Sequence, residues 1–283
     1  MLPLDKVPVI PVPEIPFTAM IPPYLHFRHF GVRILQDFYR QLLALVQSWN
    51  ERNQLVSSID ANYNTAYVYG QDGQRSNKYT QNSETLYFNK MWTHHTDSGN
   101  NVYGGQTAKN IYLGDTRIVT KLNSGHEPTY NEEYYKQYYY HSDHLGSASL
   151  ITDYKGDEYQ RIEYTPYGET WVEKTQNTGL EYLPYKFTGK EIDEETGLYY
   201  YGARYFDPRY SRWISTDLAL GEYIPSAGKD ISKLPSGGIY NPFSQSLFNY
   251  SNNNPIKYVD PNGKNPIAAI VISAIQQLKM KKL

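Results

Sequence analysis

The chain has 283 residues, a formal net charge of −2 at pH 7, no cysteine and 30 tyrosines. The near balance of charge excludes a global basic field for nucleic acid, and the lack of cysteine excludes a disulfide framework and thiolate metal sites. A chain so rich in tyrosine, with many turn residues and few long aliphatic runs, is typical of a mainly β protein with short strands.

Prolines recur through residues 1–29 and predict an extended leader, because proline fits neither a helix interior nor a central strand. Residues 30–48 carry Ile34, Phe38, Leu42 and Leu45 at helical spacing and predict an amphipathic helix packed on a β body or in an oligomer. The N-terminus lacks the pattern of a secretory signal peptide. No run of about 20 apolar residues predicts a transmembrane span.

Residues 49–175 predict several β-hairpins in series, of which those within 49–137 are degenerate repeats. Residues 67–75 form a strand, a tight turn at Asp72-Gly73 and a second strand. Residues 110–122 repeat the form around Gly114-Asp115, and residues 147–164 repeat it around 153–157, followed by a turn at 165–168. Because such hairpins bury a face only against their neighbours, we expect them to pack as an array.

Two segments carry long matches to a known family. Residues 138–147 contain the pattern Y-x-H-x-D-x-L-G-S, and residues 187–217 read FTGKEIDEETGLYYYGARYFDPRYSRWISTD. Both resemble the RHS repeat-associated core domain of Rhs/YD-repeat polymorphic toxins, and residues 67–75 resemble its YD repeat. The resemblance covers residues 138–264 strongly and 49–137 weakly. Its structural signature residues are His141, Asp143, Gly146, Arg204, Tyr205, Asp207, Pro208 and Trp213.

The segment 187–217 leads to three expectations of its own. Residues 191–195 form an acidic patch that we expect to be solvated, ending at the turn Thr196-Gly197. Residues 198–206 predict one strand with aromatic rings on both faces, closed by Asp207-Pro208, because proline cannot donate to a strand ladder. We expect Arg204 to stack on rings and to pair with a carboxylate.

Two groups of histidines are candidate metal ligands. His141 and His144 flank Asp143, but residues i and i+3 of a strand point to opposite faces. His94 and His95 are adjacent and also point apart. We therefore expect no metal site and no cofactor, with Asp143 organising a hairpin corner instead.

Asp217 and Asp260 are the candidate catalytic residues. The resemblance implies two Asp-Pro-x-Gly elements whose aspartates take part in self-cleavage directly after the second element. Two close carboxylates share a proton, so one can activate water while the other protonates the leaving group. The second element, 260–263, is intact, whereas Leu218 replaces the proline of the first and Lys264 replaces the expected leucine. The alternative is a plain β-turn at 260–263.

These features predict a mainly β fold: serial YD-type hairpins and an RHS core cap over residues 138–264, with one N-terminal helix and a short C-terminal helix at 265–283 in place of a toxin domain. The predicted function is structural, as a truncated shell or cap fragment without its own toxin. It would hold or present a C-terminal effector in bacterial competition, with that effector or the remaining Rhs shell as partner. The resemblance implies a secreted or cell-surface location. The alternatives are a surface carbohydrate-binding module and a self-cleaving aspartic peptidase, which would be its only enzymatic activity.

Overall fold

The computed structural model describes residues 46–97, 105–124, 130–175, 181–217, 246–264 and 267–268. All of them belong to the unit that spans Leu45–Leu283. The predicted leader at 1–29, most of the helix predicted at 30–48 and most of the one predicted at 265–283 lie outside the described residues. Among the helices that the structure describes, none is long and apolar enough to cross a membrane.

A 12-stranded antiparallel sheet dominates the described chain, and each strand pairs with the next in sequence. This confirms the prediction of β-hairpins in series. The strands are β1 (Val46–Trp49), β2 (Leu55–Ile59), β3 (Asn64–Tyr69), β4 (Arg75–Tyr79), β5 (Ser83–Asn89), β6 (Trp92–Asp97), β7 (Gln106–Leu113), β8 (Thr116–Ser124), β9 (Gln137–Ser142), β10 (Ala148–Thr152), β11 (Glu158–Tyr164) and β12 (Thr170–Thr175). The sheet continues without a break across residues 137 and 138, where the sequence predicted a change from repeats to core.

Within the described ranges, six turns share one hydrogen-bonding pattern, which defines the structural repeat. In each, the first N–H donates to the fifth carbonyl, and the fourth N–H donates back to the first carbonyl. The fourth residue has a positive φ, between 58° and 88°, and is glycine in every case except Asn53. Glycine suits this position because it adopts a left-handed backbone without steric cost. The turns span 50–54, 70–74, 143–147, 153–157, 165–169 and 186–190.

Bulges beside these turns decide which side chains face inward. In β2, β4 and β10 the first and fourth residues are buried, which is not the usual alternation of a strand. The register of each shifts near its first residue. A bulge adds one residue to the strand, so residues three apart fall on the same face. Leu55 and Ser58, Arg75 and Lys78, and Ala148 and Ile151 occupy these inward pairs.

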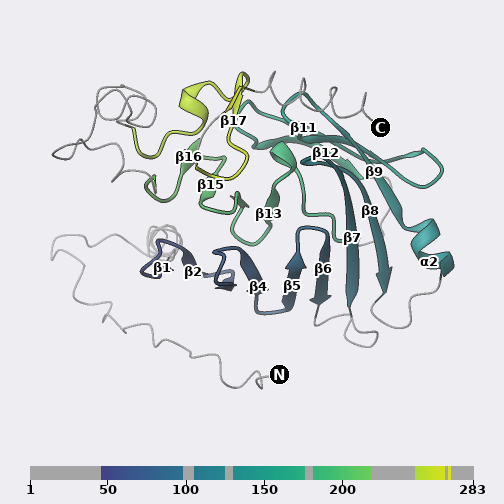
Figure 1. Cartoon of the computed structure of the whole chain (residues 1–283), viewed down its shortest axis with the longest axis horizontal. Helices are drawn as coiled ribbons and strands as arrows, with labels where there is room; N and C mark the ends of the chain where they lie inside the picture. The colour runs from purple at the N-terminus through teal and green to yellow at the C-terminus, as the bar shows by residue number, and fades with distance from the viewer. Residues whose placement is uncertain are drawn as a thin grey trace, which may run out of the picture. The chain divides into compact units, whose positions relative to one another are not determined.

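A second, four-stranded antiparallel sheet follows the long one. It contains β13 (Glu191–Asp193), β14 (Leu198–Tyr200), β15 (Tyr205–Asp207) and β16 (Arg212–Trp213). Figure 1 shows it in the bend of the long sheet, between β1–β8 and β9–β12. Side-chain contacts of the shorter sheet agree: Asp193 binds Arg75 of β4, Tyr205 packs on Tyr67 of β3, and the Tyr199 hydroxyl donates to the carbonyl of Gly168, between β11 and β12, at 3.1 Å. The long sheet therefore wraps around the shorter one.

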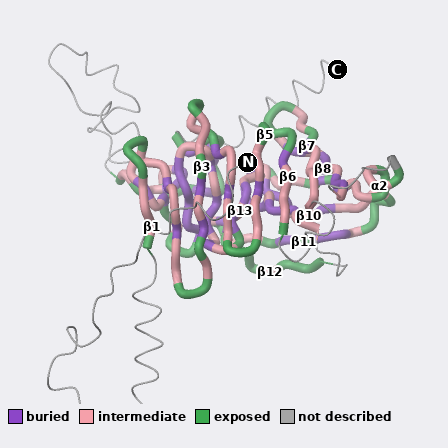
Figure 2. Tube along the Cα trace, turned by 90° about the horizontal axis from the view of Figure 1, so that it is seen from below, coloured by how far each residue is buried: buried purple, intermediate pink, exposed green. Residues whose placement is uncertain are grey.

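The interior between the two sheets is largely aromatic. One core cluster contains Leu145, Phe187, Tyr199, Tyr201, Phe206, Trp213 and Tyr250. Two others centre on Leu122 and Ile151 and on Leu55 and Tyr67. Figure 2 shows exposed residues at the turns and along β12, and buried ones along the other strands. The tyrosine count therefore reflects a core built from rings.

Several predicted elements need correction. Residues 46–48, assigned by sequence to the end of a helix, belong to β1 and pair with β2. Within the predicted C-terminal helix, Ile267–Ala268 form strand β18, which pairs with β17 (Tyr258–Val259). The structure also contains a helix that was not predicted, α2 (Tyr130–Tyr135), whose Glu132 and Glu133 bind Ser124 and Asn123 of β8. In each case contacts with a neighbouring segment outweighed the local pattern.

Candidate functional site

The stretch 198–206 is a hairpin, not the single strand expected from sequence. β14 ends at Tyr200, β15 begins at Tyr205, and the two pair antiparallel. Gly202 has a φ of 92°, which permits the reversal, and the Tyr201 N–H donates to the Arg204 carbonyl at 3.0 Å. The turn places Arg204 at one end of the four-stranded sheet. As expected, β15 ends at Asp207, directly before Pro208.

Arg204 is the centre of the candidate site. Its guanidinium lies 4.3 Å from the centroid of the Trp213 ring. Its two terminal nitrogens approach different carboxylates: Nη1 lies 3.4 Å from Oδ2 of Asp217, and Nη2 lies 3.5 Å from Oδ2 of Asp260. The structure thus brings the two candidate catalytic residues to one buried cation, which both stacks and pairs as the sequence suggested.

Asp260 also organises the turn that follows it. Its Oδ1 accepts the N–H groups of Asn262, Gly263 and Lys264 at 3.2, 2.8 and 3.1 Å. Burial raises the pKa of the Asp260 carboxyl, while Arg204 and the three N–H groups act in the opposite direction. Burial is thus the largest influence on the Asp260 carboxyl, and it acts toward the protonated form.

Three carbonyls of this turn each accept a donor from the signature segment. Pro261 O accepts Lys190 Nζ at 2.6 Å, Asn262 O accepts the Ala203 N–H at 3.1 Å, and Gly263 O accepts Arg204 Nε at 2.6 Å. A Cβ on Gly263 would lie 3.0 Å from the backbone nitrogen of Arg204, so the lack of a side chain at Gly263 lets the two backbones approach closely. The segment 260–264 is thus held against the hairpin formed by β14 and β15.

The other signature residues fix corners of the fold. Asp143 Oδ1 accepts the N–H groups of Leu145 and Ser147, and Gly146 supplies the positive φ of that turn. Asp207 binds the side chain of Arg209, and the buried Pro208 starts the turn to β16. The Tyr205 hydroxyl lies 3.1 Å from that of Tyr69. The Trp213 ring packs on Phe206, Tyr201 and Tyr250.

The acidic segment 191–195 is solvated only in part, because Glu194 is its one exposed residue, and this corrects the expectation from sequence. Glu191 and Asp193 are buried, 4% and 0% exposed. Arg75 binds Glu191 at 2.9 Å and Asp193 at 2.8 Å, while Lys78 lies 3.4 Å from Asp193 and 3.2 Å from Glu195. Sequence analysis missed this network because its cations lie in β4, far away in the chain.

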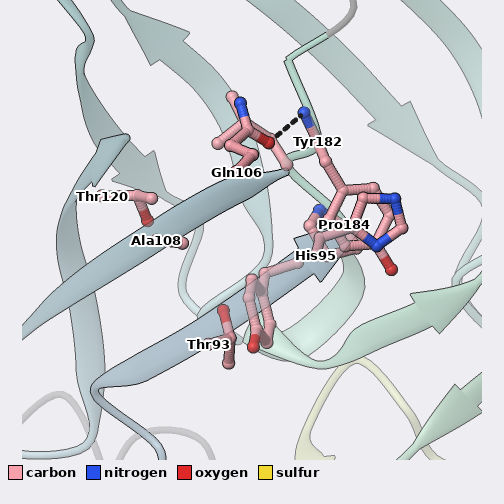
Figure 3. A pocket seen from close by; sticks show the side chains of 9 residues that line it. Thr93, His95, Gln106, Ala108, Thr120, Tyr182 and Pro184 are labelled. Atoms are coloured by element: carbon pink, nitrogen blue, oxygen red, sulfur yellow. Dashed lines mark hydrogen bonds between the residues drawn. The ribbon is translucent and has the colours of Figure 1, made fainter. Parts of the chain in front are cut away.

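Residues 181–186 cross the inner face of the long sheet. The Tyr182 ring stacks on His95 at 3.9 Å, and Arg117 lies over the Tyr185 ring. Burial lowers the pKa of His95 to about 4, so its imidazole is neutral at pH 7. Tyr182 and His95 line a cavity of about 10 Å³. Figure 3 shows both side chains, with the Tyr182 N–H bound to the Gln106 side chain. This cavity holds one water molecule at most.

The histidines weighed as metal ligands have separate partners. His141 Nε2 lies 3.1 Å from Thr152 Oγ1, and His144 Nε2 lies 3.1 Å from the Ile256 carbonyl oxygen. His94 Nδ1 lies 2.9 Å from Thr107 Oγ1, while His95 Nδ1 contacts Thr85. Across the described ranges, no group of three or more metal-ligating side chains forms.

Comparison with known proteins supports the resemblance to the RHS/YD-repeat family that the sequence carries. A family model described as Teneurin YD-shell matches residues 124–256. The chain is 30% identical over 203 residues to the tRNA3(Ser)-specific nuclease WapA of Bacillus spizizenii, covering 70% of this chain and 7% of that protein. It is 29% identical over 239 residues to toxin subunit YenC1 of Yersinia entomophaga, covering 77% of this chain and 22% of that protein.

Solved structures share the fold. A crystal structure of TcdB2-TccC3 has a TM-score of 0.59 and 25% identity, covering 78% of this chain and 10% of that chain. The Photorhabdus luminescens Tc holotoxin pore has a TM-score of 0.59 and 24% identity, covering 79% of this chain and 10% of that chain. With serial hairpins, the signature segment and these similarities together, the chain belongs to the RHS/YD-repeat family.

Proposed function

We propose that this chain forms the closing part of an RHS-type toxin shell, which holds or presents a C-terminal effector. The observation that carries the proposal is the wrapping of the hairpin sheet around the signature sheet, with the turn 260–264 held at its end. The similarity to toxin subunit YenC1 and to the fold of TcdB2-TccC3 supports the role. By the same reasoning, the location is secreted or at the cell surface.

The packing of the tyrosines favours the shell over a carbohydrate-binding surface. Tyr199, Tyr201, Tyr205 and Tyr250 are each 2% exposed or less, so their faces are unavailable for stacking on a sugar. A lectin-like role would require rings exposed in a row along a groove. The prediction that this chain is a truncated cassette without its own toxin stays a prediction.

A chimera tests the shell role. This chain would replace the matching segment of YenC1, and limited proteolysis would be followed on the region downstream of the replaced segment. We expect the downstream region to be digested no faster than in native YenC1 treated in parallel. A downstream region digested as quickly as when it is expressed alone would contradict the proposal.

We propose self-cleavage directly after residues 260–263 as a second candidate function. The observation that favours it is the approach of Asp217 and Asp260 to one guanidinium. The Lys264 N–H also contacts Asp260 Oδ1 at 3.1 Å, so the carboxyl already lies against the nitrogen of the Gly263–Lys264 peptide bond. Arg204 Nε donates to the carbonyl of the same peptide bond, where negative charge would develop.

The chemistry is hydrolysis. The ionised carboxylate takes a proton from water as the water oxygen bonds to the carbonyl carbon. The carbon–nitrogen bond then breaks, and the protonated carboxyl gives its proton to the leaving amine. Asp260 is assigned the protonated role, because burial raises its pKa. Since this role requires a proton on Asp260, cleavage is expected to be faster at mildly acidic than at neutral pH.

Intact mass spectrometry of the full chain tests this second function. We expect the loss of a fragment that begins at Lys264 or Asn265, abolished in Asp260→Asn and in Asp217→Asn. Asp157→Asn, at an exposed turn, is the matched control and should cleave as the unsubstituted chain does. A full-length mass that persists at both pH values would exclude self-cleavage.

A further inference from the structure

Lys190 occupies the last position of the repeated turn 186–190. The Lys186 N–H donates to the Lys190 carbonyl at 2.9 Å, and the Lys190 N–H donates to the Phe187 carbonyl at 2.9 Å. Phe187 is 1% exposed and lies in the aromatic core cluster. Both the N–H and the carbonyl of Lys190 are therefore hydrogen-bonded within the turn, which fixes the position of its Cα.

The side chain of Lys190 extends to the turn 260–264. Its Nζ donates to Pro261 O at 2.6 Å and lies 5.5 Å from the centroid of the Tyr201 ring. Proline has no N–H, so the carbonyl is the only main-chain hydrogen-bonding group of Pro261. Lys190 and Arg204 thus hold two carbonyls of the same turn, those of Pro261 and Gly263.

The electrostatic surroundings of Lys190 are mixed. Burial lowers the pKa of the Lys190 ammonium to about 8, with Asp260 and Asp115 favouring the charged form and Arg117 and Lys90 opposing it. Asp260 faces Lys190, Arg204 and Tyr250. A lysine placed for solubility alone would lie in open solvent, whereas this ammonium is partly buried, at a cost that Asp260 offsets in part.

We propose that Lys190 is a positioning residue, which fixes the Pro261 carbonyl and a positive charge beside Asp260 so that the turn 260–264 stays presented to Asp217 and Arg204. The contact between Lys190 and Pro261 does not depend on self-cleavage. An effect of Lys190 on the rate of cleavage does rest on the self-cleavage proposal. Nothing in the role requires Lys190 to touch the reacting atoms.

Three variants of the full chain separate the parts of this role. Lys190→Met removes the donor and the charge but keeps the length of the side chain, Lys190→Gln keeps an N–H donor without charge, and Lys190→Arg keeps both. Lys174→Met is the matched control, because Lys174 is an exposed lysine of β12. Far-UV circular dichroism checks the fold of each, and Lys190→Ala, which also lacks the donor and the charge, replaces Lys190→Met if the latter does not fold.

Hydrogen exchange at the amides of Gly263 and Lys264 is the first measurement. A hydrogen bond from a charged donor is worth about tenfold or more in the opening equilibrium. We therefore expect exchange to be about tenfold faster in Lys190→Met, and to return to the original rate in Lys190→Arg. Lys174→Met should not change it. Unchanged exchange in Lys190→Met would overturn the donor part of the proposal.

The titration of the Asp260 carboxyl, followed by carbon NMR, is the second measurement. Removal of the neighbouring positive charge should raise the pKa of Asp260 in Lys190→Met and Lys190→Gln but not in Lys190→Arg. A merely structural lysine would leave this pKa unchanged, and that result would overturn the charge part.

Fragment release is the third measurement, and it keeps the two proposals distinguishable. If the unsubstituted chain cleaves, Lys190→Met should cleave more slowly while Lys190→Arg keeps the rate. If the unsubstituted chain stays intact, self-cleavage fails, yet exchange and titration still decide the role of Lys190. Normal cleavage in Lys190→Met would show that positioning by Lys190 is not needed for processing.

Discussion

Buried charge is the main feature at the scale of single residues. Arg75, Lys78 and Asp193 are each 4% exposed or less, and they join the long sheet to the signature sheet. Tyr67, Tyr87 and Tyr200 surround the Arg75 guanidinium at ring-centroid distances of 4.5–5.5 Å. Ion pairs in an interior contribute little net stability when intact, but removal of one partner leaves an uncompensated charge.

We therefore predict that Asp193→Asn lowers the free energy of unfolding by roughly 3 kcal/mol. Burial raises the pKa of Asp193, but Arg75 and Lys78 outweigh burial, so the net direction is downward. A carboxyl with a depressed pKa stabilises the fold above its unfolded pKa of about 3.9, and that contribution is lost as pH falls. Urea unfolding at neutral and acidic pH measures both effects.

Glu194→Gln is the matched control for this prediction. Glu194 is the exposed neighbour of Asp193, and its substitution should change stability by about 0.5 kcal/mol or less. Equal losses for the two variants would contradict the assignment of Asp193 to a buried network.

The repeated turn is the main feature at the scale of elements. Its fourth residue needs a left-handed backbone, and the space beside it differs from turn to turn. At Gly168, φ is +85° and a Cβ would lie 2.3 Å from the Phe187 ring. At Gly156, φ is +87° but no atom lies within 4 Å of the position of a Cβ. The two glycines therefore separate backbone strain from steric contact.

We predict that Gly156→Ala destabilises the protein by about 1 kcal/mol through strain alone. Gly168→Ala should lower the free energy of unfolding by about 1–3 kcal/mol more than Gly156→Ala does, because the core must shift around the new methyl group. Chemical denaturation of the two variants gives the comparison. Equal costs would mean that Phe187 moves freely, against its place in the aromatic core cluster.

Tyrosine packing is the main feature at the scale of the whole molecule. Burial raises the pKa of Tyr250 to about 12 and raises that of Tyr201 and Tyr205 well above the usual value. Tyrosine in an unfolded chain ionises near pH 10. The folded state therefore holds more protons than the unfolded state above about pH 10, and stability falls as pH rises.

We predict that alkaline unfolding and the ionisation of the buried tyrosines occur in one transition. Absorbance of tyrosinate would be followed with far-UV circular dichroism between pH 8 and 12. Below about pH 10 the contribution of these tyrosines to stability is fully present, so the dichroism should not change there. Full ionisation of all 30 tyrosines while the dichroism stays native would contradict the buried core.

The sequence by itself determined the fold class, the serial hairpins and the family. Turns such as Asp72-Gly73 and Gly114-Asp115 are local, because a left-handed backbone selects glycine wherever the chain reverses. The segments 138–147 and 187–217 were long enough to carry the resemblance. The same information named Asp217, Asp260 and Arg204 as residues to examine.

Only the tertiary structure decided which partners the candidate residues contact. The acidic segment 191–195 looks solvated until β4 supplies Arg75 and Lys78, and a bulge that the strand period does not predict turns both cations inward. Residues 198–206 look like one strand until Gly202 reverses them. Lys190 reaches Pro261 and Arg204 reaches Asp260 through contacts between segments far apart in sequence, and charge pairing of this kind leaves no periodic signal in either segment.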